Sequence, residues 1–308
     1  MISIVLPAHN EQDNASAIYA EIRKYLPDIE VEIVFVDDGS TDATAARVRE
    51  LRARDPLVRL IRFSRNFGQQ AALLAGLQAA RGAAVITMDC DLQHPPEYLP
   101  RMVAEWKDGA KIVRMVRQDT AGASGFKKLT SRLFYRILQK LSETPVAKDA
   151  ADYALLDRQI VDQLLKFGDR RPFLRGMISW LGFPELQIEY VAAGRHAGKP
   201  AYSLRKMIRL SLDAVTSLSS KPLRMALYLG FSAAALAVAY LVFVLVAYQQ
   251  GKVLPGWTSI IGATVFLGGA QLICIGIIGE YIARIYDHTR RVPPFVIAED
   301  ENEPPKSH

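Results

Sequence analysis

The sequence AVITMDCDLQHPPE, residues 84–97, contains the pattern from which the fold can be built outward. Its first five residues, 84–88, are apolar except for Thr87, and the acidic tripeptide Asp89-Cys90-Asp91 follows at once. Such an apolar run is typical of a strand that is buried on both faces, as in a parallel sheet. Polar residues directly after the strand lie at its carboxyl end, where open α/β sheets bind their ligands.

The same pattern recurs through the first part of the chain. Short apolar runs that predict strands occupy residues 2–6, 32–36, 58–63 and 83–88. Amphipathic stretches that predict helices lie between them, at residues 15–25, 43–53 and 70–80. Strands that alternate with helices at this spacing favour an α/β fold with a mainly parallel, Rossmann-like sheet. The polar clusters, all expected at the carboxyl ends of strands, are residues 7–11, 37–42, 64–70 and 89–97.

Asp89 and Asp91 are two positions apart, so in an extended backbone their carboxylates point to the same side. Hard anionic ligands in this place suit Mg²⁺ or Mn²⁺ that carries a substrate diphosphate. Taken alone, the motif is better explained by two solvated aspartates at a strand end. No G-x-G-x-x-G or G-x-x-x-x-G-K-[ST] loop follows the first strand, so neither a dinucleotide fold nor a P-loop is supported. A phosphate donor would then need a metal.

Asp37 and Asp38 end the second predicted strand. Gly39 permits a tight turn, and Ser40 or Thr41 can cap the following helix. An ordinary strand–helix turn accounts for the glycine and the cap but leaves two adjacent acids unexplained. These acids could accept hydrogen bonds from a nucleobase or a ribose.

The composition excludes several classes of protein. Of the 308 residues, 50% are hydrophobic and 23% are charged, with a formal net charge of +6, which excludes a disordered chain. The two cysteines, Cys90 and Cys274, cannot form a disulfide framework, and the five histidines lack the spacing of a zinc site. No serine–histidine or cysteine–histidine nucleophile is recognisable.

The apolar residues are concentrated in two C-terminal runs. No charged residue occurs at positions 225–251 or 253–279, and each run exceeds the roughly 20 residues that span a bilayer. Basic residues flank both runs, whereas the linker holds only Lys252, so a hairpin with both ends in the cytoplasm is predicted. The basic, apolar-striped segment 201–224 is predicted to lie on the lipid headgroups, with packing on the domain as the alternative.

These patterns predict a division of the chain into successive parts. A cytoplasmic α/β domain covers residues 1–200, and juxtamembrane amphipathic helices cover residues 201–224. A transmembrane hairpin covers residues 225–286, with spans at about 225–250 and 257–282, and a cytoplasmic tail covers residues 287–308. The acidic, proline-containing residues 299–308 are predicted to be disordered.

Together these motifs resemble the family-2, GT-A-fold glycosyltransferases, and among them the branch that acts on polyprenyl phosphate. That branch includes dolichyl-phosphate mannose synthase, bactoprenol glucosyltransferases and undecaprenyl-phosphate aminoarabinose transferase. The matching segments come in family order, at residues 5–11, 36–42, 65–69, 89–97 and 219–224. The resemblance implies a GT-A catalytic domain, a juxtamembrane amphipathic helix and two C-terminal transmembrane helices.

The resemblance also implies roles for individual residues. Those expected to hold the nucleotide are Pro7, Ala8, Asn10, Glu11, Asp37, Asp38, Gly39, Arg65 and Gly68. Those expected to hold Mg²⁺ or Mn²⁺ with the diphosphate are Asp89, Asp91 and Gln93. The expected catalytic acids are Asp89 and Asp91 together with two acids near the sugar, Asp152 and Asp157. Contacts to the acceptor phosphate are expected from Arg117, Lys127, Ser131 and Arg195.

The chain departs from the family pattern in three places. Residues 151–154 read Ala-Asp-Tyr-Ala where relatives commonly have Gly-Asp-Phe-Arg. Residues 198–202 read Gly-Lys-Pro-Ala-Tyr where relatives have Gly-x-Ser-Lys-Tyr, and the usual arginine and glutamate after Arg117 are missing. These changes bear on sugar specificity and acceptor-phosphate binding more than on the class of reaction.

The implied reaction is the inverting transfer of a sugar from a nucleotide-sugar, expected to be a UDP-sugar, to polyprenyl (undecaprenyl) phosphate. The implied location is the cytoplasmic face of the bacterial inner membrane, with the chain as a multi-pass protein. The acceptor phosphate is already anionic, so its positioning by basic groups matters more than a strong general base. Apolar faces of the spans could also join copies of the chain, up to a tetramer, and no nucleic-acid partner is expected.

Two other functions stay open on the sequence. A processive polysaccharide synthase shares the N-terminal motifs, but such enzymes normally carry a Q-x-x-R-W motif, absent here, and more spans. A non-catalytic, membrane-anchored nucleotide-sugar binding protein would account for the altered segments at 151–154 and 199–201. The intact Asp89 and Asp91 argue against it.

Overall fold

The structure, a computed structural model, describes residues 1–117, 150–167, 173–191, 221–250, 256–289 and 292–301. The chain divides into two compact units. Unit 1 comprises Met1–Tyr135, Pro145–Ser203 and Val292–His308, and unit 2 comprises Arg136–Thr144 and Leu204–Arg291.

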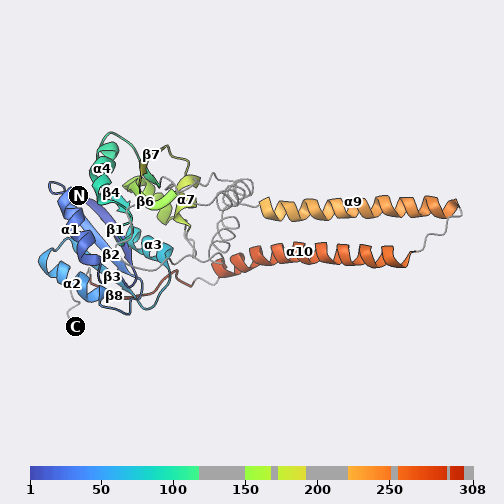
Figure 1. The fold of residues 1–308 in the computed structure, drawn as a ribbon, viewed down its shortest axis with the longest axis horizontal. Coiled ribbons are helices and arrows are strands. Elements are labelled where there is room, and N and C mark those ends of the chain that lie inside the picture. The colour runs from blue at the N-terminus through green and yellow to red at the C-terminus, as the bar shows by residue number, and fades with distance from the viewer. Residues whose placement is uncertain (118–149, 168–172, 192–220, 251–255, 290–291, 302–308) are drawn as a thin grey trace. The chain divides into compact units, whose positions relative to one another are not determined.

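Unit 1 is built on an eight-stranded sheet with the order β7-β5-β6-β4-β1-β2-β3-β8 (Figure 1). The strands are β1 (Ile2–Ala8), β2 (Val31–Asp37), β3 (Val58–Phe63), β4 (Ala84–Thr87), β5 (Ile112–Arg117), β6 (Ala150–Asp157), β7 (Glu185–Tyr190) and β8 (Ile297–Asp300). The central strands β4, β1, β2 and β3 are parallel, β7 is parallel to β5, and β6 and β8 are antiparallel to their neighbours. The predicted mainly parallel α/β fold is confirmed.

Helices cover both faces of this sheet. They are α1 (Ala15–Tyr25), α2 (Thr44–Arg54), α3 (Gln69–Ala79), the 3₁₀ turn η1 (Pro96–Tyr98), α4 (Leu99–Lys107), α6 (Arg158–Leu165) and α7 (Leu174–Trp180). Alternate residues of a strand point to opposite faces. Ile4 and Leu6 of β1 therefore pack with α1, α2 and α4, whereas Val5 packs with α3, α6 and α7.

Helix α3 packs very closely on β1. A Cβ atom at Gly76 would lie 2.1 Å from Cγ1 of Val5, so only glycine allows the helix to lie at this distance. This contact matters for the site, because α3 begins with Gln69 and Gln70 at the carboxyl ends of the central strands. The close packing sets where their side chains emerge.

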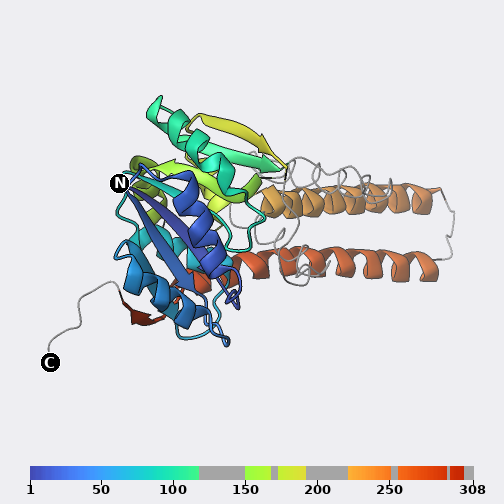
Figure 2. The same ribbon diagram turned by 60° about the vertical axis from the view of Figure 1, so that its left-hand side comes forward.

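The C-terminal segment adds the last strand of the sheet. β8 pairs antiparallel with β3 at the sheet edge (Figure 2), and the Phe295 ring stacks on Phe63 with centroids 4.9 Å apart. Arg49 of α2 forms ion pairs with Glu299 and Glu301. The prediction of a disordered tail from residue 299 is therefore wrong for residues 299–301, and residues 302–308 lie outside the described part.

Unit 2 contains two long helices, α9 (Lys221–Gln249) and α10 (Trp257–Thr289), which run antiparallel side by side (Figures 1 and 2). Their windows Leu223–Tyr240 and Gly262–Ala283 are long and apolar enough to cross a membrane, with hydropathies of 1.5 and 1.8. Within the described residues, only 6% of the first window and 0% of the second is buried. The prediction of two apolar C-terminal helices is confirmed, whereas the amphipathic segment at 201–220 lies outside the described residues.

Candidate active site

The carboxyl end of β4 presents Asp89 and Asp91, each oriented by amide donors. Gln69 Nε2 donates to Asp89 Oδ1 at 2.6 Å. Gln93 donates to Asp91 twice, from its backbone nitrogen at 3.1 Å and from Nε2 at 2.8 Å. Loss of hydration, together with the charges of Asp152 and Asp91, raises the pKa of Asp89 to about 7. Negative charge is therefore concentrated here, as the sequence predicted.

His94 closes the turn that follows these acids. The Asp89 backbone N–H donates to His94 Nδ1 at 2.9 Å, and His94 Nε2 lies 3.6 Å from Asp89 Oδ2. Burial lowers the pKa of His94 to about 4, so the ring is neutral near pH 7. Because Nδ1 accepts a hydrogen bond, the ring proton is on Nε2 and faces the carboxylate. The ring also stacks on Tyr153, with centroids 4.9 Å apart, which fixes the turn.

A further carboxylate, Asp152 on β6, lies beside Asp89. β6 runs antiparallel to β4, which brings Asp152 near the carboxyl end of that strand. Its side chain is only 6% exposed, and Arg175 donates to both oxygens, from Nε at 2.6 Å and from Nη2 at 2.9 Å. Gln70 Nε2 adds a third hydrogen bond at 3.0 Å. Asp152 is therefore held by a bidentate ion pair within the site.

Sequence reasoning missed the residues that hold these acids: Gln69, Gln70 and Arg175. The two glutamines begin α3, and each holds one acid. Arg175 lies on α7, far along the chain, and only the fold brings it to Asp152. One signal could have pointed to it. Since position 154 is alanine where the family pattern in the sequence analysis has arginine, a counter-charge for Asp152 could be sought on another element.

The donor set at β4 fits a divalent cation that also binds the substrate. Within the described residues, no group of three or more acidic, histidine or cysteine side chains is arranged to hold a metal ion. Asp89 and Asp91 alone would leave open positions for phosphate oxygens and water, as Mg²⁺ and Mn²⁺ prefer. The nearby charges of these two acids also contribute to raising the pKa of Glu11, after burial as the main cause. The side-chain amide nitrogen of Gln93 donates to Asp91, so Gln93 orients this carboxylate, which is the expected metal ligand.

The loops after β1 and β2 are joined through Asn10. Its backbone N–H donates to Ser40 Oγ at 2.9 Å, and its Oδ1 accepts from the Thr41 backbone N–H at 2.9 Å. His9 Nδ1 lies 2.9 Å from the backbone oxygen of Asp38. Asn10 adopts a left-handed conformation, with φ of 58°, which asparagine tolerates better than most residues. The two predicted nucleotide loops thus form one surface.

The acids Asp37 and Asp38 both have structural partners. Asp37 Oδ1 accepts from the Ser40 N–H at 2.8 Å. Asp38 accepts from the N–H groups of Phe67 and Gly68, at 2.6 and 2.9 Å, and so ties the β2 loop to the start of α3. Burial raises the pKa of Asp38, although these two hydrogen bonds act against the shift. Both acids therefore shape the loops, in addition to the nucleotide contacts that we expect.

Gly39 lies where these loops approach most closely, with φ of +66°. A Cβ atom there would lie 2.4 Å from the Arg65 carbonyl carbon and 2.7 Å from the Asn66 nitrogen. Because backbone cannot move aside cheaply, we expect Gly39→Ala to lower the free energy of unfolding by about 2–4 kcal/mol. Thermal unfolding of the detergent-solubilised chain measures this loss.

Gly109 provides the matched control for the Gly39 prediction. Its φ is +108°, but a Cβ atom there has nothing within 4 Å. Gly109→Ala should therefore show the strain of the left-handed backbone alone, about 1–2 kcal/mol. Equal losses in the two variants would contradict the importance of the close approach.

Other predicted nucleotide residues lie at the same end of the sheet. Pro7 and Ala8 end β1, and Glu11 Oε2 accepts from Asn14 Nδ2 at 2.6 Å. The Arg65 guanidinium lies 4.1 Å from the centroid of the Phe67 ring. Gly68, with φ of 99°, immediately precedes α3.

Asp157 does not lie near this site, contrary to expectation. It is opposite Ala84, at the amino end of β4, whereas Asp89 follows the carboxyl end. There Asp157 caps α6 by accepting from the Gln159 N–H, and it also accepts from Trp106 Nε1 at 2.9 Å. Its function is therefore structural.

Of the residues expected at the acceptor phosphate, the structure describes Arg117. It ends β5, whose carboxyl end points the same way as that of β4, and its side chain is exposed. Its positive charge contributes to the pKa shifts of His94 and Tyr190, so it lies near these two rings. Lys127, Ser131 and Arg195 lie outside the described residues.

Comparison with known protein families gives two matches in this chain. Residues 3–165 match the model described as "Glycosyl transferase family 2", and residues 221–285 match the "GtrB C-terminal hairpin". The chain is 37% identical to the bactoprenol glucosyl transferase of Shigella phage SfV over 303 residues, 97% of this chain and 99% of that protein. It is also 37% identical to the uncharacterized glycosyltransferase YkcC of Bacillus subtilis (strain 168), over 96% of this chain and 92% of that protein.

Solved structures share the fold at low identity. Glucosyl-3-phosphoglycerate synthase from Mycobacterium tuberculosis, in complex with phosphoglyceric acid, has a TM-score of 0.50 and 21% identity, covering 70% of this chain and 79% of that one. Mannosyltransferase PcManGT from Pyrobaculum calidifontis, in complex with GDP-Man and Mn²⁺, has a TM-score of 0.50 and 17% identity, covering 89% and 86%. These similarities confirm the GT-A fold.

Proposed function

This chain belongs to glycosyl transferase family 2, and we propose that it transfers a sugar from a UDP-sugar to polyprenyl (undecaprenyl) phosphate. The observation that carries the proposal is the cluster of Asp89, Asp91 and Asp152 at the carboxyl end of β4, in a chain that also has the hairpin of residues 221–285. The near-full-length similarity to a bactoprenol glucosyl transferase supports the lipid acceptor.

The donor would lie across the loops after β1, β2 and β4. The joined loops at Asn10 and Ser40 would take the nucleotide, and Asp89 and Asp91 would hold Mg²⁺ or Mn²⁺ with the diphosphate. When bound, the ion offsets the negative charge that develops on the departing nucleotide. Asp152, fixed by Arg175, would accept hydrogen bonds from sugar hydroxyls.

The acceptor phosphate has to be positioned by basic residues and does not have to be deprotonated by a general base. Phosphate is anionic near neutral pH, so a single displacement that inverts the anomeric centre requires no strong general base. Arg117 offers an exposed guanidinium at the same end of the sheet as Asp89 and would attract this phosphate. Lys127, Ser131 and Arg195 are proposed to act with it.

The hairpin would bring the enzyme to its lipid. Basic residues flank both apolar helices, whereas the loop between them holds only Lys252. This asymmetry favours both ends on the cytoplasmic side of the bacterial inner membrane. The enzyme would then meet the lipid phosphate where it emerges from the bilayer.

Labelling of a lipid tests the proposal directly. Membranes that contain the chain should convert radiolabelled UDP-glucose and undecaprenyl phosphate into a labelled product that is soluble in organic solvent. A chelator should abolish the labelling, and Mn²⁺ or Mg²⁺ should restore it. UDP-galactose and UDP-N-acetylglucosamine, tested in parallel, identify the preferred sugar.

Membranes without the chain are the control. Label in an insoluble polymer would instead indicate a processive synthase. Nucleotide binding without release of UDP would indicate a non-catalytic binding protein. Either result would contradict the proposed reaction.

A further inference from the structure

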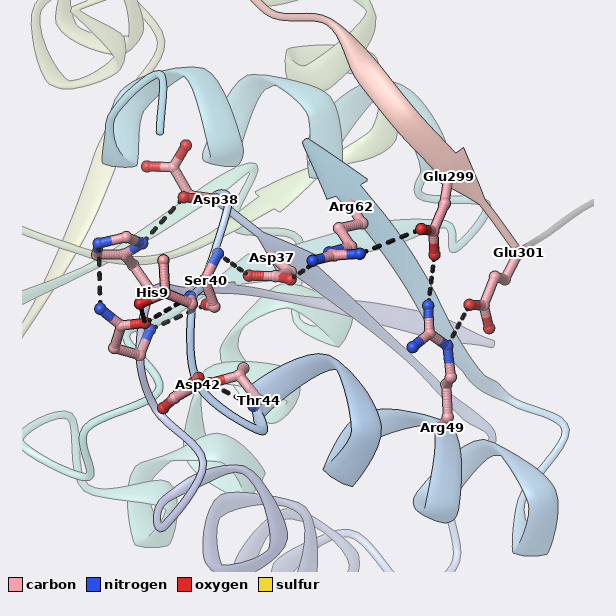
Figure 3. A network of polar contacts seen from close by, with 12 residues as sticks. His9, Asp37, Asp38, Ser40, Asp42, Thr44, Arg49, Arg62, Glu299 and Glu301 are labelled. Atoms are coloured by element: carbon pink, nitrogen blue, oxygen red, sulfur yellow. Dashed lines mark hydrogen bonds and ion pairs between the residues drawn. The ribbon is translucent and has the colours of Figure 1, made fainter. Parts of the chain in front are cut away.

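A row of charged side chains crosses three strands beside the donor loops. Asp37 of β2 is in register with Arg62 of β3, which is in register with Glu299 of β8. Residues opposite one another on neighbouring strands point to the same face, so their charges alternate along one line (Figure 3). Arg62 Nη1 donates to Glu299 Oε1 at 3.1 Å, and Arg62 Nε lies 3.3 Å from Asp37 Oδ2.

The row continues into the donor loops. Asp37 Oδ1 accepts from the Ser40 N–H at 2.8 Å, and Ser40 Oγ in turn accepts from the Asn10 N–H at 2.9 Å. The loop that carries Asn10 is the one proposed to take the nucleotide. A change in the position of Asp37 would therefore move both loops.

The contact between Arg62 and Asp37 depends on how the guanidinium is held. The Asp37 side chain is 1% exposed, so its charge needs a counter-charge. Within the described part of the chain, neither Asp37 Oδ2 nor Arg62 Nε has a hydrogen-bond partner, because the two meet without hydrogen-bond geometry. The Arg62 side chain is 35% exposed and can turn toward solvent. On its other side, the Arg62 guanidinium contacts Glu299.

The strand β8 is held in place by other contacts as well. Glu301 accepts from Arg49 Nε at 2.5 Å and from Arg52 Nη1 at 3.0 Å. The stacking of Phe295 on Phe63 adds an apolar contact at the same edge. The side chains of both glutamates pair with Arg49 of α2, and of the two it is Glu299 that also contacts Arg62. Replacing Glu301 therefore weakens the docking of β8 without breaking the contact between Glu299 and Arg62.

We infer that Glu299 is a positioning residue of the donor site, which acts on Asp37 through Arg62. The inference rests on the proposed function, in which the loops at Asp37 and Asn10 take the nucleotide. It makes the segment after the second apolar helix a part of the donor site. Neutralising Glu299 releases Arg62 toward solvent and leaves the buried Asp37 without its counter-charge, so the loops lose their bound arrangement.

Nucleotide binding by the full chain in detergent tests this inference. Titration calorimetry with UDP, in the presence of Mn²⁺, should give a Kd about three- to tenfold higher for Glu299→Gln than for wild type. Glu301→Gln, which cuts β8 contacts without touching Arg62, should change the Kd less than about twofold. Both variants should lower the midpoint of thermal unfolding to a similar extent, because both weaken docking of the strand.

A second cycle keeps the test valid if Glu299→Gln folds poorly. Arg62→Gln should weaken UDP binding on its own, and adding Glu299→Gln to it should have no further effect. Equal Kd values for Glu299→Gln and Glu301→Gln, or additive effects of the Arg62 and Glu299 changes, would overturn the inference. Failure of the wild type to bind UDP, GDP or CDP would instead overturn the proposed function on which it rests.

Discussion

Asp91→Asn is expected to lower sugar transfer by about 10³-fold or more while the chain remains folded. Asparagine keeps the size of the side chain and can still accept one of the two hydrogen bonds that Gln93 donates to Asp91. It removes one negative charge from the pair that would hold the divalent ion and the diphosphate. The loss should appear as a lower kcat at saturating UDP-sugar and as weaker binding of Mn²⁺, measured by electron paramagnetic resonance.

Asp108→Asn is the control for this prediction. Asp108 is exposed at the end of α4, so its replacement removes the same charge without touching the site. Transfer by this variant should match wild type. If Asp91→Asn kept wild-type transfer and wild-type Mn²⁺ binding, the assignment of a metal to the end of β4 would fail.

The central strands could be predicted from the sequence because parallel strands buried on both faces read as continuous apolar runs. The strand predicted at residues 58–63 and the helix predicted at 15–25 match β3 and α1. The same logic located Asp89 and Asp91, since polar residues that follow a buried strand have only its carboxyl end to occupy. For these strands, the local sequence pattern is therefore enough to give the position of the residues in the sheet.

For the antiparallel strand β6, the local sequence pattern does not give the positions of its acidic residues in the sheet. Asp152 and Asp157 are close in sequence, and the family resemblance implied that both lie near the sugar. An extended chain rises about 3.4 Å per residue, which places them roughly 17 Å apart along β6. One acid therefore reaches the site, and the other caps α6 at the opposite end. The direction of a strand follows from long-range pairing, which local pattern does not report.

Strand β8 escaped prediction for a related reason. Its four residues, Ile297–Asp300, are too few and too acidic to show a strand pattern. Their partners come from distant segments: Arg62 from β3, and Arg49 from α2. A short acidic segment becomes ordered when a basic edge is present, and that edge exists only after the rest of the sheet has formed.

Arg175→Met is expected to lower transfer by about 10²–10³-fold, the second largest effect after the loss of Asp91. Arg175 donates to both oxygens of Asp152, whose side chain is 6% exposed. Removing one partner of a buried pair leaves the other charge uncompensated, next to Asp89 and the proposed diphosphate. Steady-state kinetics should show the change in kcat more than in the KM for the UDP-sugar.

Two further variants separate the charge of Arg175 from its geometry. Arg175→Lys keeps the charge but loses the bidentate contact, so its activity should lie between those of wild type and Arg175→Met. Arg101→Met removes an arginine whose side chain is 60% exposed on α4 and should leave transfer unchanged. If Arg175→Met matched Arg101→Met, Asp152 would not need its partner for catalysis. The family's usual arginine at position 154, which this chain lacks, would then have no replacement on α7.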